Sequence, residues 1–247
     1  GYRAARSNTT GANNVAIGKS AGYSNTTGAT NTFIGEESGF WNTTGSSNTA
    51  LGADAYAGSN TATGSYNTAI GRSALTANTT GTENAAVGMS SAAANTTGSY
   101  NVSLGKGTLE TNTTGSSNTA VGTNSLQNAT TASNNTAVGA SALQSNTTGA
   151  TNVAVGFQAL KDNTTGSDNV AVGELALENN TTGVRNTALG TNALYTKTTG
   201  NDNVAVGNAA LYATTTAANN TGVGANALQA NTTGDTNTAV GKDSMKT

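Results

Sequence analysis

Glycine recurs every 17 residues along this 247-residue chain, and this period constrains the fold more than any other feature. The series begins at Gly1, Gly18 and Gly35. A single interval, from Gly52 to Gly71, is 19 residues long. A unit this short cannot bury a core alone, so neighbouring units must stack on one another. The chain is therefore expected to form a stack of coils rather than a globule.

The composition is consistent with such a stack. Charged residues make up 9% of the chain, against about 25% in ordinary domains, and Pro, Cys and His are absent. The apolar residues are few but regularly placed, which argues against disorder. A net charge of -2 gives no reason to expect nucleic acid or an anionic membrane as a partner. No apolar run is long enough to span a bilayer.

Asparagine heads each unit. It is followed by Thr or Val (Ala once, at Ala85), a small residue that is nearly always Ala, an aliphatic residue and the recurring Gly. A short run of β-branched residues closed by Gly predicts a strand. Stacked copies place identical amides above one another, so we expect a side-chain ladder along the axis. This head asparagine column comprises Asn14, Asn31, Asn48, Asn67, Asn84, Asn101, Asn118, Asn135, Asn152, Asn169, Asn186, Asn203, Asn220 and Asn237.

Alternation along the strand separates two faces. The Thr/Val and aliphatic columns share one face, and the alanine column, which includes Ala120, Ala154 and Ala205, lies on the other. We expect the aliphatic face to fill the coil and the flat alanine face to pack against an identical chain. A charge at these alanines should then disrupt assembly, whereas a charge change at Asp168 or Thr191, both expected to be exposed, should not.

The rest of the unit holds an Ala-Leu pair, such as Ala142-Leu143, and a corner, Asn-Thr-Thr-Gly. The pair is either a short strand or one helical turn, and a strand is favoured because adjacent coils must keep pairing. Its Leu is expected to point inward. Corner Gly permits a tight reversal, and Asn and Thr can bond nearby backbone. The Asn-x-Thr sequons at Asn8, Asn25 and Asn146 would accept glycans in a glycosylating host, but a hydrogen-bonding role is favoured.

These patterns predict an all-β fold: a single-stack β-solenoid, or parallel β-roll, of about 14 coils over residues 1–247, with one 19-residue coil at 53–71. Open sheet edges at the two ends of such a stack favour further coils or end-to-end association into a filament. The repeat begins and ends mid-pattern, so we expect a segment of a longer chain.

The five-residue strand motif resembles a known repeat. Residues 14–18, Asn-Val-Ala-Ile-Gly, are similar to the head repeats of trimeric autotransporter adhesins, and residues 146–160 resemble repeats of phage tail-fibre proteins. The resemblance covers essentially the whole chain. It implies a parallel β-roll in which three chains associate along their lengths, located outside the cell, on its surface or on a virion. Contact with a cell surface or glycan is then expected through flanking parts outside this sequence.

The sequence offers little chemistry. Absence of His and Cys removes the commonest bases, nucleophiles and transition-metal ligands. The 12 acidic residues form no repeating column, and Glu36-Glu37 is expected to be a solvated loop. Calcium-binding solenoids carry an Asp in every unit, which this repeat lacks. We therefore expect no catalytic, metal or cofactor site, and no enzyme.

One aromatic cluster stands out. Tyr23, Phe33, Phe40 and Trp41 form the densest aromatic stretch, followed by Tyr56 in the 19-residue unit. They are candidates for a contact patch toward a glycan or a neighbouring segment. Packing inside a wider coil is the favoured alternative, because aromatic side chains usually serve packing.

The function expected from this repeat is structural: the shaft of an extracellular or virion fibre that supports adhesion or anchoring. The alternative is an ice-binding or other surface-binding solenoid, since Thr columns recur at about 4.8 Å, the spacing of strands in a sheet.

Overall fold

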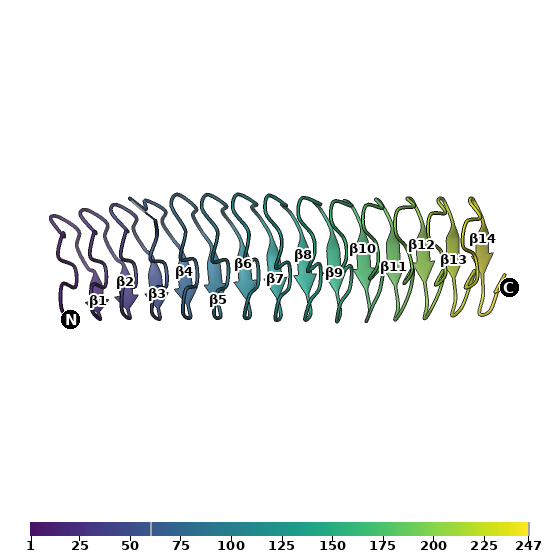
Figure 1. Cartoon of the computed structure of the whole chain (residues 1–247), viewed down its shortest axis with the longest axis horizontal. Helices are drawn as coiled ribbons and strands as arrows, with labels where there is room; N and C mark the ends of the chain where they lie inside the picture. Colours follow the sequence, from purple (N-terminus) through teal and green to yellow (C-terminus); the bar gives the residue numbers. More distant parts are fainter. Residues whose placement is uncertain (60, 247) are drawn as a thin grey trace. The chain divides into compact units, whose positions relative to one another are not determined.

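The computed structural model describes residues 1–59 and 61–246, in which strands are the only regular elements. The chain divides into two compact units, Gly1–Asn124 and Ser125–Thr247. Each unit is a parallel, single-sheet β-solenoid, which confirms the predicted fold class (Figure 1). A single continuous stack stays a prediction. Asn60, in the 19-residue coil at 53–71, and Thr247 lie outside the described residues.

Each coil contributes one three-residue strand, which follows the head asparagine. The first unit contains β1 (Val15–Ile17), β2 (Thr32–Ile34), β3 (Thr49–Leu51), β4 (Thr68–Ile70), β5 (Ala85–Val87), β6 (Val102–Leu104) and β7 (Thr119–Val121). The second unit contains β8 (Thr136–Val138), β9 (Val153–Val155), β10 (Val170–Val172), β11 (Thr187–Leu189), β12 (Val204–Val206), β13 (Thr221–Val223) and β14 (Thr238–Val240).

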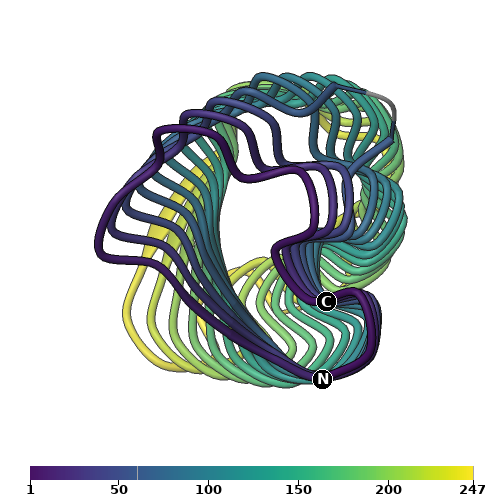
Figure 2. The ribbon, with the colours of Figure 1, turned by 90° about the vertical axis from the view of Figure 1, so that its left-hand side faces the viewer.

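Within each unit, every strand pairs in parallel with the next strand along the chain. The register is strict: Ala154 of β9 lies opposite Ala171 of β10, and Val155 lies opposite Val172. Successive coils of a unit therefore follow almost the same path (Figure 2). Because residues one sequence period apart lie opposite each other, each column of the repeat becomes a row of stacked side chains.

The strand faces point opposite to the expected directions. From β2 to β14 the middle residue of each strand is buried, and Ala120, Ala154 and Ala205 are 0% exposed. Val155 and Val172, by contrast, are 36% and 39% exposed. The alanine column thus faces the interior, and the prediction that it packs on another chain was wrong. Leucines and two rows of asparagines also occupy the interior, which leaves the strand room for little more than a methyl group.

The Ala-Leu segment is a turn and not the favoured strand. Leu160 is buried as expected, but its φ is 52°, and Gln158 has a φ of 55°. Left-handed backbone costs an L-residue roughly 1–2 kcal/mol. This left-handed conformation lets the backbone N–H groups of the turn bond to two different coils. Gln158 N donates to Ala140 O in the preceding coil at 3.0 Å, whereas Leu160 N donates to Ala176 O in the following coil at 3.0 Å. The chain thus bonds to both neighbours within three residues.

The recurring glycine stands where each coil leaves its strand. Gly156 has a φ of 138°, a conformation that L side chains rarely adopt. A Cβ placed on it would lie 2.5 Å from the carbonyl oxygen of Gly173 in the next coil. Both the backbone conformation and the close packing of the coils therefore require glycine here, which explains why glycine recurs at this position in each coil.

The buried alanine column generates a test. Ala154→Asp should destabilise the folded chain by several kcal/mol, because it places an unpaired carboxylate in the interior. Thermal unfolding followed by circular dichroism measures this. Thr165→Asp, at an exposed corner of the same coil, is the control and should change little. Equal tolerance at both positions would contradict the inward direction of this column.

Two other residues were expected to be exposed. Asp168 is exposed, whereas Thr191 is half-buried.

Candidate functional site

The head asparagines form a buried hydrogen-bonded ladder. The backbone N–H of Asn169 donates to Asn152 Oδ1 at 3.0 Å, and its side-chain Nδ2 donates to the same oxygen at 3.1 Å. Asn152 Nδ2 also crosses its own coil and donates to Gly166 O at 2.9 Å. Asn152 and Asn169 are fully buried. Each amide thus both closes its own coil and joins it to the next.

A second ladder runs through the corner asparagines. Asn163 Nδ2 donates to Asn146 Oδ1 in the preceding coil at 2.8 Å, and to Gly166 O in its own coil at 2.9 Å. Gly166 O therefore accepts from both asparagines of its coil. Asn146 and Asn163 are fully buried. The side chain of the Asn146 sequon is consumed inside the fold, whereas Asn8 is exposed.

The corner ladder stops where another residue replaces asparagine. Asn42 Oδ1, Asn112 Oδ1 and Asn180 Oδ1 are buried without a hydrogen-bond partner among the described residues. Ala129 follows Asn112 in the corner column and has no side-chain amide. Lys197 occupies the corner position in the coil after Asn180.

In the coil after Asn42, Tyr56 replaces the corner asparagine as a hydrogen-bond donor. Tyr56 Oη donates to the corner carbonyl, Gly64 O, at 2.7 Å. Burial raises the pKa of Tyr56 to about 12.

Lys197 is the one fully buried lysine among the described residues. Its Nζ donates to Ala217 O, the corner carbonyl of the following coil, which also accepts from Asn203 Nδ2 at 3.0 Å. Burial lowers the pKa of Lys197 to about 8, and attraction to Asp235 offsets part of this shift. The amino group therefore replaces the amide donor of the ladder at the cost of burying a charge.

The structure splits the candidate contact patch. The rings of Tyr23 and Phe40 stack with centroids 4.9 Å apart, and Trp41 meets Phe40 edge-on at 4.9 Å. Trp41 is 41% exposed and Arg6 Nη1 donates to Tyr23 Oη at 2.9 Å, so this part lies at the surface. Phe33 is 1% exposed and belongs to the interior, so its inclusion in the patch was wrong.

Phe33 fits the interior because glycine replaces leucine around it. It stands in the alanine column, and Gly22 and Gly39 stand where other coils carry the buried Leu. A Cβ on Gly39 would lie 2.4 Å from Phe33 Cδ1, and one on Gly22 would lie 2.9 Å from Phe33 Cδ2. The ring therefore fills the space that leucine leaves, so the extra volume stays inside the coil.

Side chains of the surface columns also pair from coil to coil, and these pairs were not predicted from the sequence. Tyr195 and Tyr212 stack at 5.2 Å in the column that contains Tyr23 and Phe40. Arg185 Nε donates to Asp202 Oδ1 at 2.6 Å. In both pairs the partners are 17 residues apart, and this spacing is the sequence signal that would have found them. Most polar side chains that bond do so along the stack.

Exposed ionisable side chains pair between neighbouring coils. Lys19 Nζ lies 2.7 Å from Glu36 Oε1, so Glu36 pairs with the preceding coil and stays exposed. The described residues contain no group of three side chains suited to hold a metal ion. Residues 1–59 and 61–246 also include no helix long and apolar enough to cross a membrane.

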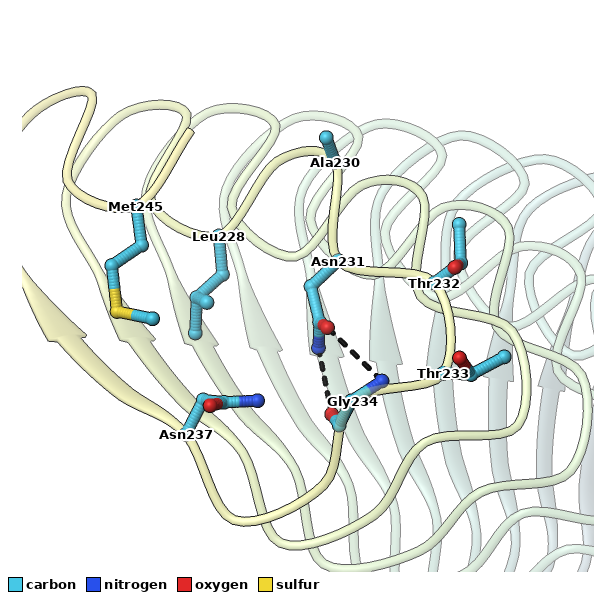
Figure 3. A pocket seen from close by; sticks show the side chains of 8 residues that line it. All are labelled: Leu228, Ala230, Asn231, Thr232, Thr233, Gly234, Asn237 and Met245. Atoms are coloured by element: carbon cyan, nitrogen blue, oxygen red, sulfur yellow. Dashed lines mark hydrogen bonds between the residues drawn. The ribbon is translucent and has the colours of Figure 1, made fainter. Parts of the chain in front are cut away.

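A hollow of about 280 Å³ lies beside the corner at Asn231 (Figure 3). Asn231 Nδ2 donates to Gly234 O at 2.9 Å, and Gly234 N returns a bond to Asn231 Oδ1 at 3.1 Å. Leu228 and Met245 supply its apolar wall. Its lining contains no ionisable side chain.

Comparison of this chain with protein-family models, curated proteins and solved structures finds no match.

The complementarity of Phe33 and its glycines predicts strong coupling. Gly39→Leu alone should destabilise the protein by about 1–3 kcal/mol through overpacking. Its backbone conformation is no obstacle, since Leu75 adopts a φ of 50° in the same column. The triple variant Phe33→Ala, Gly22→Leu and Gly39→Leu should recover most of the loss. Urea unfolding midpoints measure both, and strictly additive effects would show that these residues do not interact.

Lys197 predicts a pH-dependent stability. Between pH 8 and 10 the unfolded chain keeps the lysine proton and the folded chain releases it, so stability should rise with pH. Above pH 10 the raised pKa of Tyr56 opposes the trend, because the unfolded chain then ionises first. Lys197→Asn should remove the rise and stabilise the protein at neutral pH. Thermal unfolding against pH measures it. Lys106→Asn, at an exposed lysine, should leave the slope unchanged.

Proposed function

We propose that this chain is the structural shaft of an extracellular, cell-surface or virion fibre, without enzymatic activity, that supports an adhesive or anchoring part. The observation that carries this proposal is the direction of its polar contacts. Both asparagine ladders and the pairs between surface columns run along the stack, as in Asn163–Asn146 and Arg185–Asp202. Such contacts stabilise a long stack, because each added coil forms them again with its neighbour.

Lateral and end-to-end self-association belong to this proposal. The resemblance to autotransporter heads favours a homotrimer packed along the axis, and open sheet edges favour end-to-end growth. The alanine face no longer supports lateral packing, since it is buried. A different surface must carry it. Contact with a cell surface or glycan is proposed for parts outside this sequence.

A surface-binding solenoid is the second candidate. One Thr of each corner, such as Thr97 and Thr165, is exposed, and this column repeats in every described coil. The other corner Thr is engaged, as when Thr164 Oγ1 donates to Thr181 O at 2.9 Å. The exposed corner Thr form one narrow column, and Val and Ala85 interrupt the outward Thr of the strands. The absence of a regular face with two hydroxyl columns favours the shaft. Thermal hysteresis in a solution of the protein would favour ice binding.

The shaft proposal is tested by location. Gold-labelled antibodies against this chain should decorate fibres that project from the cells or particles that carry it. The labels should spread along the fibre, because the epitope repeats with each coil. Label confined to the cell interior, or absent from any filament, would contradict the proposal. Antibody from a non-immunised animal serves as the control.

A further inference from the structure

The outward side chains of the strands form one uncharged surface in each unit, here called the strand face. It consists of the first and third residues of β1–β7 in one unit and of β8–β14 in the other. These positions hold only Val, Ile, Leu, Thr and Ala85. Ile17, Leu51 and Leu104 are 57%, 46% and 38% exposed. Apolar side chains thus remain in contact with water along every coil.

The absence of charge from this face is not a property of the whole chain. It contains 10 Lys and Arg and 12 Asp and Glu, and none of them stands on the strand face. The columns on its two sides carry several. The column after the recurring Gly includes Lys19, Glu36, Arg72, Lys106, Glu174 and Lys242. The column before the head asparagine includes Glu83, Asp168, Arg185 and Asp202. An apolar centre with a charged rim is typical of protein interfaces.

We propose that the strand face packs against the same face of a second copy of this chain. This inference rests on the proposed shaft, and it replaces the homotrimer with a two-fold pair as the lateral arrangement of the copies. The face is self-complementary, because two uncharged apolar sheets can pack face to face about 10 Å apart. When each unit's strand face meets the face of the same unit in the other copy, both copies use the same patches, and this closes a two-fold pair. A cyclic trimer would need two different contact patches on each chain.

The available area is sufficient for such a pair. Three residues span about 10 Å and seven strands span about 34 Å, so each unit offers roughly 340 Å². A chain that pairs through each of its two units separately offers this area twice, about 680 Å² in total. A pair would then bury about 1,400 Å², within the 1,200–2,000 Å² of stable interfaces. Val and Thr follow one another irregularly in the column of first strand residues, which favours a protein partner over the regular lattice of ice.

Light scattering of the whole chain tests the proposal. The expected mass is twice 24.1 kDa, and it should persist at high salt because the face has no charges. The variant Leu104→Lys with Val172→Lys places one charge on the face of each unit and should reduce the mass to that of one chain. The matched control, Thr114→Lys with Thr182→Lys, alters exposed corners of the same two coils and should stay paired.

A second variant guards against misfolding. Leu104→Thr with Val172→Thr uses a residue that the other outer column already contains, and should weaken pairing without loss of the circular dichroism spectrum. A monomeric wild type, a mass of three chains, or unchanged pairing in the lysine variant would each overturn the proposal. None of these outcomes changes where antibodies bind, so failure of the pair and failure of the shaft are distinguishable.

Discussion

Hydrogen bonds between buried asparagine amides and neighbouring coils are the interaction on which the rest of this structure depends. A buried amide without partners costs about 1–3 kcal/mol, which favours an equivalent amide one coil away, as in every coil of the head asparagine column. Asn152 shows the full set: its oxygen accepts from the next coil and its nitrogen closes its own. This preference explains why the period is strict and why a thin core of Ala and Leu suffices.

Departures from the repeat come in sets that match across neighbouring coils. Phe33 is matched by Gly22 and Gly39. Buried hydroxyls do the same elsewhere: Ser103 Oγ lies 2.7 Å from both Ser91 Oγ and Thr108 Oγ1, in adjacent coils. The coils are therefore not interchangeable, because a coil paired with the wrong neighbour would lose its complement. Near-identical repeats need such differences to specify one register.

The sequence predicted the strand, the inward Leu and the fold class, because each rests on spacing alone. It did not predict which strand face is interior, since Val and Ala are both apolar and alternation separates faces without ranking them. One signal was present in the sequence. Glycine replaces leucine at Gly22 and Gly39, beside the one large residue of the alanine column, Phe33. This exchange indicates that the alanine and leucine columns share the same interior. The left-handed turns also had a signal. Asn and Asp recur at those positions, as at Asn192 and Asp168, and tolerate positive φ.

The gap in the corner ladder has a consequence for how the second unit comes apart. Stacked coils behave as a one-dimensional array in which each is coupled mainly to its neighbours. Between Asn180 and Asn231 the corner amide is absent, with Lys197 and Thr214 in its place. Two successive coils therefore lack the corner amide, whereas Ala129 interrupts the ladder in one coil only. We expect amide hydrogens in these two coils to exchange with solvent before those of the flanking coils. We therefore expect cooperative unfolding of the second unit to divide at these coils, so that the coils on either side melt as two blocks.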